Sequence, residues 1–534
     1  MTGFDRRSFL SGSGALLAGA IGAPRVSPRT PHNPSREDEW QAVRDQFALD
    51  PDIAHFAAFV LASPPKVVRD AIDRIRAALD FDASHYVDQN IDGPVRRAAA
   101  SYLDALPGEI ALTQSTTAGL GLVYGGLQLG EGDEVLTTEH DFYSTYESLR
   151  RASQRTGATI NRIRLYDAPS AADAGDIVEH IADGLTPRTR AVAITWVHSG
   201  TGVKLPIRAI AELLAEHNES AGDERPALLC VDGLHGFGVE DETMASLGCD
   251  VFVAGTHKWI WGPRGTGIVW ATATAWESIT GPTPPFEQTH FDGWISQEPP
   301  GPAPGGPANT PGGYVDFEHR MAMKEAFEFH EFVGKAAIQE RTHGQATQLK
   351  EGLSEIAGVQ LVTPMSADLS SGIVCLTFAD TGRQFALLDD LRAAGYSTSI
   401  TPYRDPYLRI GPSIVTNPDQ LTDSPRHPSV SCGDVPRETL GQHETLGCVN
   451  REWHRGRKLG ADKLASPWET LSCHKRRSIG SRPSSTTSRR ADASRSPTRS
   501  NGHASSATCQ RTVTTTRRRT SKATWRAASD SSST

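Results

Sequence analysis

The fold is decided by the stretch Val251-Phe252-Val253-Ala254-Gly255-Thr256-His257-Lys258-Trp259, which is followed by the glycine-rich turn Gly262-Pro263-Arg264-Gly265-Thr266-Gly267. An apolar, β-branched run ends at a small residue, and Thr, His and Lys then arrive together, which is typical of a buried strand that ends at polar groups. A lysine at the exit of a hydrophobic strand is costly unless it is bonded or neutralised. The alternative is an ordinary surface lysine, so Lys258 needs a second signal.

That second signal lies upstream, in Leu228-Leu229-Cys230-Val231-Asp232-Gly233-Leu234-His235-Gly236. Another buried-type strand ends in an acid here, with a histidine shortly after it. A buried lysine can form a Schiff base with a carbonyl cofactor. Pyridoxal 5′-phosphate (PLP) needs both a lysine for its aldehyde and a carboxylate that keeps the pyridine nitrogen protonated. Asp232 and Lys258 therefore predict a PLP site, in which His235 bonds either Asp232 or the ring oxygen.

The motifs V-D-G-x-H-G and G-T-H-K-W-x-x-G-P-R-G-T-G resemble the class V aminotransferase group of fold type I PLP enzymes, over roughly Asp50 to Leu421. That group includes cysteine desulfurases and isopenicillin N epimerase-like proteins. Three further stretches are most similar to exported epimerase-like members: Thr113-Gln114-Ser115-Thr116-Thr117, Thr138-Glu139-His140 and Phe317-Glu318-His319-Arg320. The resemblance implies an amino-acid substrate and a homodimer.

The segment Ser115-Thr116-Thr117-Ala118-Gly119 opens a helix after a strand at 110–113. Hydroxyls and free backbone N–H groups at a helix start make an anion site, although an ordinary Ser/Thr N-cap is the alternative. Similar proteins bind the cofactor phosphate here. The resemblance therefore implies that the phosphate is held by Thr116, Thr117, Ala118, Thr256 and His257.

The resemblance also assigns three residues outside these motifs. His140 matches a histidine that stacks on the pyridine ring in similar enzymes and can relay protons, whereas the alternative is a surface histidine at a strand end. Ser199 stands where relatives often have an asparagine whose amide reaches the ring oxygen, which leaves open the donor to that oxygen. Thr310 lies where relatives send a hydroxyl into the neighbouring subunit's phosphate site.

Strands alternate with helices from Ile110 to Trp270, which predicts an α/β fold with a mainly parallel sheet flanked by helices. Active sites of such sheets lie at the carboxyl ends of the strands. The candidate residues all fall at those ends: Thr117, His140, Ser199, Asp232 and Lys258. Their convergence is the strongest argument for an enzyme.

Downstream, Tyr407-Leu408-Arg409-Ile410 supplies an arginine that matches the family's clamp for the substrate α-carboxylate, the alternative being a surface ion-pair arginine. Cysteine desulfurases carry a nucleophilic cysteine shortly before this arginine, whereas the segment 395–403 holds none, so the resemblance argues against a persulfide-forming desulfurase. Aminotransfer and isopenicillin N epimerase-like chemistry remain open, with a C–S lyase as the alternative. A protein inactivated by a damaged C-terminus is the second hypothesis.

Charge is distributed unevenly along the chain. Residues 424–534 hold 21 Lys and Arg against 8 Asp and Glu, whereas the preceding residues hold 33 against 55. The acidic body argues against nucleic-acid or anionic-membrane binding. The basic, Ser/Thr-rich tail cannot bury a core, which predicts a disordered or frameshifted segment. Seven cysteines show no metal-ligand spacing, so we expect no metal.

Five regions follow from these patterns. Arg6-Arg7 before a short apolar run predicts a twin-arginine export signal, and thus a periplasmic or extracellular protein; the alternative is a chance arginine pair and a cytoplasmic protein. The run is too short for stable membrane insertion. We expect signal and linker at 1–30, an N-terminal segment at 31–60, a large PLP-binding domain at 61–300, a small α+β domain at 301–423 and the tail at 424–534.

Overall fold

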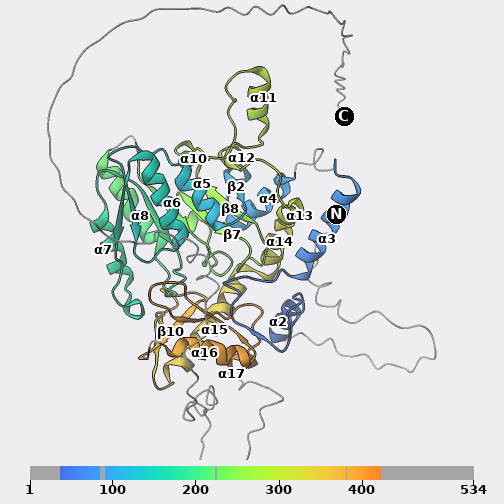
Figure 1. Cartoon of the computed structure of the whole chain (residues 1–534), viewed down its shortest axis with the longest axis vertical. Coiled ribbons are helices and arrows are strands. Elements are labelled where there is room, and N and C mark those ends of the chain that lie inside the picture. Colours follow the sequence, from blue (N-terminus) through green and yellow to red (C-terminus); the bar gives the residue numbers. More distant parts are fainter. Residues whose placement is uncertain (1–35, 85–90, 223–224, 381, 423–534) are drawn as a thin grey trace, which may run out of the picture. The chain divides into compact units, whose positions relative to one another are not determined.

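The structure is a computed structural model that describes residues 36–84, 91–222, 225–380 and 382–422 (Figure 1). The predicted export signal at Arg6-Arg7 and the basic tail lie outside these residues. Within the described ranges, no helix combines the length and the apolar content needed to cross a bilayer.

A seven-stranded sheet forms the centre of the large domain, in the order β2-β8-β7-β6-β5-β3-β4. β3 to β7 run parallel to one another, and β8 runs antiparallel to both of its neighbours. The predicted α/β fold with a mainly parallel sheet is therefore confirmed. The strands are β2 (Ile110–Thr113), β3 (Glu134–Thr138), β4 (Thr159–Ile163), β5 (Thr189–Thr195), β6 (Leu228–Asp232), β7 (Val251–Gly255) and β8 (Gly267–Ala271).

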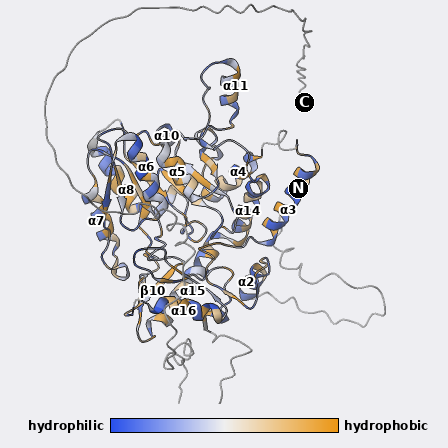
Figure 2. Ribbon diagram, in the orientation of Figure 1, coloured by the Kyte–Doolittle hydropathy of each residue, from blue (hydrophilic) through white to orange (hydrophobic). Residues whose placement is uncertain are grey.

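Side chains of the central strands alternate between two hydrophobic cores, one on each face of the sheet. On β7, Val251 and Val253 belong to one core, whereas Phe252 and Ala254 belong to the other. The continuous apolar runs in the sequence arise because both faces are covered by helices. Figure 2 shows hydrophobic residues gathered around α5. The first core is covered by α5 (Thr116–Gly126), α6 (Tyr143–Thr156) and α10 (Ala273–Glu277).

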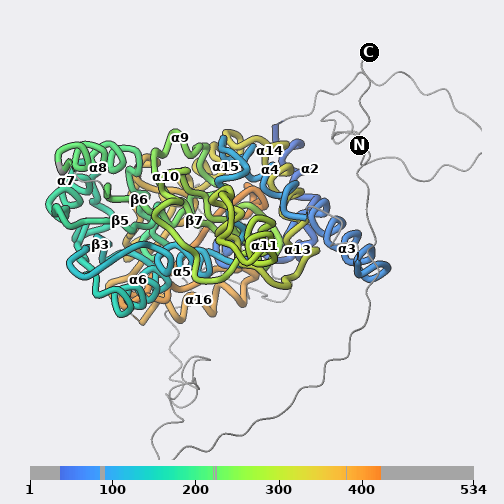
Figure 3. The backbone as a smooth tube through the Cα atoms, turned by 90° about the horizontal axis from the view of Figure 1, so that it is seen from above, coloured from blue at the N-terminus to red at the C-terminus, as the bar shows by residue number. Residues whose placement is uncertain are grey.

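The second core lies under helices from both the beginning and the end of the large domain. Figure 3 shows α7 and α8 beside the β5 and β6 end of the sheet and α3 and α13 toward its other end. These helices are α3 (Lys66–Phe81), α4 (Asp92–Leu103), α7 (Ala174–Gly184), α8 (Ile207–Ala221), α13 (Phe317–Met321) and α14 (Met323–Val333).

Helices that follow residue 300 also pack on the large domain. Ala322 and Phe327 are buried in the second core with Tyr102 of α4, and α12 (Gly305–Asn309) packs against β2. The segment from Phe317 to Ser354 forms three helices, α13, α14 and α15. The last of them, α15 (Lys335–Ser354), begins after Gly334, whose φ of +96° interrupts the helix. Packing therefore places the domain boundary near Gly334.

The small domain contains a four-stranded antiparallel sheet in the order β12-β13-β10-β9. Its core lies between this sheet and α15 and α16 (Arg383–Ala393). The strands are β9 (Val359–Leu361), β10 (Val374–Phe378), β12 (Ser399–Ile400) and β13 (Leu408–Ile410).

The N-terminal segment packs against the small domain. β1 (Ala54–His55) pairs in parallel with β11 (Tyr396–Ser397), and α2 (Arg36–Arg44) shares a hydrophobic cluster with Phe329, Ile414 and others. The remaining short elements are η2 (Pro107–Glu109), η3 (Pro169–Ala171), α9 (Met244–Leu247), α11 (Gln288–Ser296) and α17 (Asp419–Thr422).

Candidate active site

The sheet topology brings four of the candidate residues to one edge. His140, Ser199, Asp232 and Lys258 lie at or just after the carboxyl ends of β3, β5, β6 and β7. Because these strands are parallel neighbours, their carboxyl ends meet at the same edge of the sheet. α5 begins at this edge too, since the Gly255 N–H at the end of β7 donates to Thr116 Oγ1 at 2.8 Å.

Lys258 is presented by a tight turn after β7. The Gly262 N–H donates to the Thr256 carbonyl at 2.8 Å, and the Trp261 N–H donates to the Lys258 carbonyl at 2.9 Å. Trp261 takes a left-handed φ of +58°, and its indole is buried against Phe47. That packing offsets the cost of a left-handed bulky residue. The turn thus fixes the backbone from which the lysine side chain projects.

The Lys258 amine lies beside His235. Lys258 Nζ and His235 Nε2 are 3.4 Å apart, and the Trp259 indole N–H donates to His235 Nδ1, also at 3.4 Å. Because the indole is only a donor, the neutral His235 ring carries its proton on Nε2, facing the amine. Burial lowers the pKa of Lys258 to about 8, and Asp232 only partly opposes this effect. The amine is therefore readily obtained in its neutral, nucleophilic form.

Asp232 ends β6 with its carboxyl group buried. Burial raises the pKa of Asp232 to about 7, while the Leu234 N–H, which donates to Oδ1 at 3.2 Å, and the charge of Lys258 both oppose the rise. The described hydrogen bonds of His235 go to Lys258 and Trp259, so the predicted bond between His235 and Asp232 is not formed. Asp232 instead presents a buried acid to which a protonated ring nitrogen can donate.

The start of α5 has the features of an anion site. Ser115 is the N-cap and accepts from the Ala118 N–H at 3.1 Å. Thr117 is an exposed residue, and its hydroxyl shares a hydrogen bond of 2.9 Å with Ser144. The first N–H groups of a helix have no partner inside the helix, and the helix dipole favours an anion there. Thr116 uses its hydroxyl to hold α5 against β7, so its direct contribution to an anion comes from its backbone.

His140 follows the carboxyl end of β3, in surroundings that favour its neutral form. Its imidazole is stacked on Tyr166, and its Nε2 accepts from the Leu165 N–H at 3.2 Å. Burial, and then the neighbouring His198, lower the pKa of His140 to about 3. The adjacent Asp141 is fully buried and accepts from Thr137, both polar groups of Thr138 and the Thr195 N–H. These bonds fix the loop that carries His140.

Three of the residues predicted to contact the cofactor, Thr256, His257 and Thr310, have polar groups that are hydrogen-bonded within the protein. Thr256 is fully buried, and its hydroxyl is hydrogen-bonded to the hydroxyl of Thr266. His257 is half-buried, and its carbonyl accepts from the Ala62 N–H at 3.0 Å. Thr310 lies along the outer edge of β2, where its hydroxyl accepts from Arg96 and the Leu112 N–H and donates to the Gly306 carbonyl. The Thr310 hydroxyl is thus hydrogen-bonded within its own chain, and its role in the phosphate site of the neighbouring subunit stays a prediction.

Arg409 of β13 reaches the site from the small domain. Its guanidinium donates to the Ser199 carbonyl at 3.1 Å, the Ser399 hydroxyl at 3.1 Å and the Ile400 carbonyl at 3.3 Å. It lies 5.0 Å from the centre of the Phe59 ring. Burial lowers the pKa of Arg409, and no carboxylate of the described residues forms an ion pair with it. A buried guanidinium in this state is a site for a ligand carboxylate.

Tyr403 is a site residue that the sequence reasoning missed. Its hydroxyl is 2.8 Å from Ser199 Oγ, and its ring lies against Gly200, where an added Cβ would approach to 3.1 Å. A signal was available, because Ser199 stands where the resemblance led us to expect a bulkier asparagine. Tyr166 and Phe59 were missed as well, since neither stands in a motif.

The residues at this edge fit the chemical groups of PLP. A nucleophilic lysine suits its aldehyde, a buried acid suits its pyridine nitrogen, and a helix start with an exposed hydroxyl suits its phosphate. The three groups lie on neighbouring elements, since α5 is bonded to β7 and β7 pairs with β6. Residues of this chain therefore match the aldehyde, the ring nitrogen and the phosphate of the cofactor.

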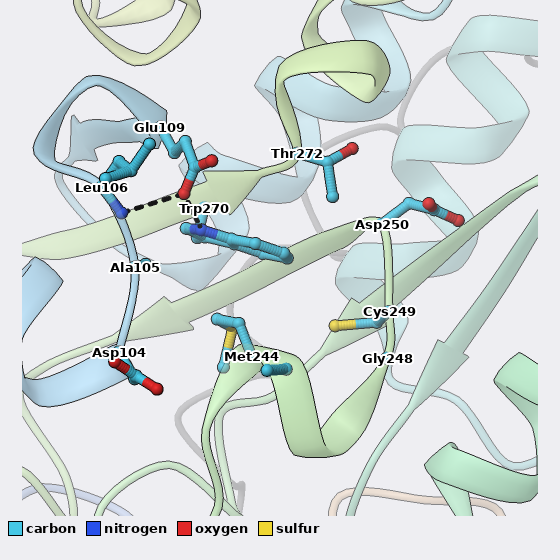
Figure 4. A pocket seen from close by; sticks show the side chains of 11 residues that line it. Asp104, Ala105, Leu106, Glu109, Met244, Gly248, Cys249, Asp250, Trp270 and Thr272 are labelled. Atoms are coloured by element: carbon cyan, nitrogen blue, oxygen red, sulfur yellow. Dashed lines mark hydrogen bonds between the residues drawn. The ribbon is translucent and has the colours of Figure 1, made fainter.

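A pocket of about 530 Å³ lies at the opposite edge of the sheet (Figure 4). Glu109, Trp270 and Asp250 line it, with Glu109 accepting hydrogen bonds from Leu106 and Trp270. Asp250 immediately precedes β7, whereas Lys258 follows the same strand. The pocket is therefore separate from the residues that fit the cofactor.

Known proteins resemble this chain over much of its length. The family model described as aminotransferase class-V matches residues 83–389. Isopenicillin N epimerase of Streptomyces clavuligerus is 26% identical over 352 residues, which cover 63% of this chain and 83% of the relative. A probable cysteine desulfurase of Halalkalibacterium halodurans is 27% identical over 280 residues, covering 51% of this chain and 63% of the relative.

Among solved structures, a C-DES mutant with glycine covalently linked to its PLP cofactor gives a TM-score of 0.64 at 21% identity, covering 71% of this chain and 96% of that one. The fold and the site define a fold type I, PLP-dependent enzyme. The chain belongs to the class V aminotransferase family, because the family model matches more than half of it. The predicted cofactor, PLP, is confirmed at the level of this family.

Proposed function

We propose that this protein acts at the α-carbon of an amino acid and is an epimerase, with aminotransfer as the second candidate. The observation that carries the proposal is the buried Arg409 guanidinium, which lacks an acidic partner among the described residues and faces the strand ends that carry Lys258 and Asp232. The epimerase relative of Streptomyces clavuligerus supports the first candidate, and the family's own description supports the second.

Arg409 binds the substrate carboxylate in this proposal. Three of its N–H groups are used by protein acceptors, which fixes the plane of the guanidinium and leaves the remaining donors for a ligand. Arg409 also lowers the pKa of Lys258 through its charge, so the two cations lie within range of each other. A carboxylate bound to Arg409 therefore brings the α-carbon toward the Lys258 amine.

Lys258 handles the α-proton. The amine lies beside His235 and is shifted toward its neutral form, so it can accept a proton and return it. When bound, PLP supplies an electron-withdrawing ring that stabilises negative charge at the α-carbon. Asp232 would hold the proton on the ring nitrogen, while α5 and Thr117 would hold the phosphate. The half-buried placement of Lys258 and the buried strand ends limit the access of water.

Persulfide chemistry is not part of the proposal. Cys230, Cys249 and Cys375 are buried, and burial raises the pKa of each thiol. The sequence from 376 to 431 contains no cysteine, so no thiol is available near Arg409 on the segment that precedes it. A thiolate nucleophile requires the opposite environment, exposed and positively charged.

The function is tested by following the α-proton with the full-length, PLP-loaded protein. A panel of amino acids in D₂O should include at least one whose α-position gains deuterium with inverted configuration, measured by NMR and chiral chromatography. Keto-acid formation that requires an added keto-acid acceptor would instead identify an aminotransferase. The amino-alcohol analogue of the responsive amino acid is the control and should not exchange, because Arg409 has no carboxylate to bind. Absence of both exchange and keto acid across the panel would refute the proposal.

We further propose that the protein is a homodimer that uses the arm around α11. Figure 1 shows α11 extending beyond α10 and α12, and this arm exposes Phe286, Trp294 and Ile295. Large apolar side chains grouped on one element are typical of an association surface. Replacing Trp294 and Ile295 with Glu should weaken association by at least roughly 10²-fold, since each buried side chain contributes about 1.5–3 kcal/mol.

Light scattering across a concentration series measures this effect. Phe81→Glu is the control, because Phe81 is also an exposed large apolar residue but lies at the end of α3. A wild-type protein that is monomeric at all concentrations, or a double variant with unchanged dimer affinity, would argue against the role of the arm.

A further inference from the structure

Tyr166 spans three neighbouring strand ends. It follows β4 at the edge of the sheet, and its hydroxyl reaches His198 Nδ1 at 2.8 Å and Thr201 Oγ1 at 3.0 Å, both of which follow β5. The sheet order places β3 between β4 and β5. The Tyr166 side chain therefore crosses the end of β3, where His140 lies.

Tyr166 covers one face of His140. The ring centres are 3.9 Å apart, and the ring planes differ by only 15°. An imidazole has two faces, and the close parallel contact uses one of them. A second flat group can therefore approach His140 only on its other face.

The backbone next to Tyr166 sets the tautomer of His140. β3 and β4 pair Thr138 with Ile163, so His140 and Leu165 each lie two residues beyond a paired position. The Leu165 N–H donates to His140 Nε2 at 3.2 Å, and the Leu165 carbonyl accepts from His180 Nδ1 at 3.0 Å. A ring nitrogen that accepts carries no proton, so the proton of a neutral His140 lies on Nδ1.

We propose that Tyr166 is a positioning residue for His140. Stacking on Tyr166 fixes the plane of the imidazole, and the Leu165 N–H fixes the tautomer in which the ring proton is on Nδ1. The proposal rests on the proposed function, because the flat group that meets the free face is the cofactor ring. His140 then contributes a flat surface and one hydrogen-bond donor, and it does not act as a base. The low pKa of His140, caused first by burial, agrees with this role.

The first measurement is made without cofactor. The full-length protein labelled with ¹⁵N-histidine should show His140 with a protonated Nδ1 and an unprotonated Nε2 at pH 7, the signals being assigned by their loss in His140→Gln. Tyr166→Phe keeps the stacked ring and should keep this pattern. A His140 protonated on Nε2, or on both nitrogens, would overturn the proposal.

The second measurement uses the circular dichroism of bound PLP in the visible range, which reports the tilt of the cofactor ring. Tyr166→Leu should reduce this signal by at least half and raise the cofactor Kd about three- to tenfold, which corresponds to the loss of one aromatic pair. Tyr166→Phe should restore the signal. Tyr146→Phe is the matched control, because its hydroxyl donates to the Thr138 carbonyl at the same strand end without stacking on His140.

The two measurements separate the proposals. Unchanged dichroism and Kd in Tyr166→Leu would overturn the positioning role even if the enzyme is active. If wild-type protein binds no PLP, the proposed function fails, and the tautomer of His140 alone decides whether Tyr166 and Leu165 hold it as inferred. A folded Tyr166→Phe variant without the wild-type dichroism would also count against a role based on stacking.

Discussion

Replacing Lys258 with Ala should abolish covalent attachment of PLP and lower the rate of α-proton exchange by about 10²- to 10⁴-fold, the range typical of a lost acid–base group. The reason is that Lys258 is the amine at the end of β7 whose pKa burial lowers to about 8. Borohydride reduction of the wild-type holoenzyme, followed by peptide mass spectrometry, should find the cofactor on the peptide that contains Lys258. The Ala variant should carry none.

Lys350 provides an internal control for this labelling. Burial also lowers its pKa to about 8, yet its Nζ donates to the carbonyls of Pro364 and Met365 and to Ser370 Oγ. Because the Lys350 amine is engaged by three acceptors, it should not react with PLP, even though its pKa is lowered. Cofactor found on Lys350, or retained by the Lys258→Ala variant, would contradict the assignment. The unfolding temperature of cofactor-free Lys258→Ala at pH 7 should not fall below that of the cofactor-free wild type. The reason is that burial disfavours the charged Lys258 ammonium in the folded wild type.

The sequence predicted the strand ends well because local patterns encode them. The apolar runs before Asp232 and Lys258 became β6 and β7, and parallel pairing then brought both residues to one edge. The start of α5 was predicted equally well from the segment that begins at Ser115, which is the N-cap of this helix in the structure. Each of these features depends on a few neighbouring residues and on the general rule that ligands bind at the carboxyl ends of parallel strands.

Contacts between distant segments were not predictable in this way. Tyr166 contacts His198 across the end of β3, so this contact depends on the order of strands in the sheet. Tyr403 contacts Ser199, so this contact depends on how the small domain packs on the large one. The Thr310 hydroxyl accepts from the Leu112 N–H at the edge of β2, a contact between segments far apart in the sequence that no local pattern indicated. The packing of α14 against α4 could not be predicted for a similar reason, because the two helices lie far apart in the sequence. A satisfied polar group is visible only when both partners are in place.

Replacing Asp232 with Asn gives the second large effect. The substitution keeps the shape of the side chain but removes the charge that would hold a proton on the cofactor ring nitrogen. Burial raises the pKa of Asp232 to about 7, and a bound cationic ring would favour the ionised carboxylate that burial alone disfavours. We expect α-proton exchange to fall by about 10³-fold, as when one preorganised electrostatic contact is lost. PLP should still become attached to Lys258.

Asp250→Asn is the matched control for this experiment. Asp250 lies at the opposite end of β7, burial also raises its pKa, and its Oδ2 accepts from the Leu229 N–H at 2.8 Å. Because it is remote from Lys258, its substitution should leave exchange within about threefold of wild type, in line with the small effects of changes away from a site. The decisive measurement is the exchange rate of fully loaded protein at saturating substrate. If Asp232→Asn retains wild-type exchange while PLP stays attached, the carboxylate does not tune the cofactor, and the chemistry must depend on Lys258 and Arg409 alone.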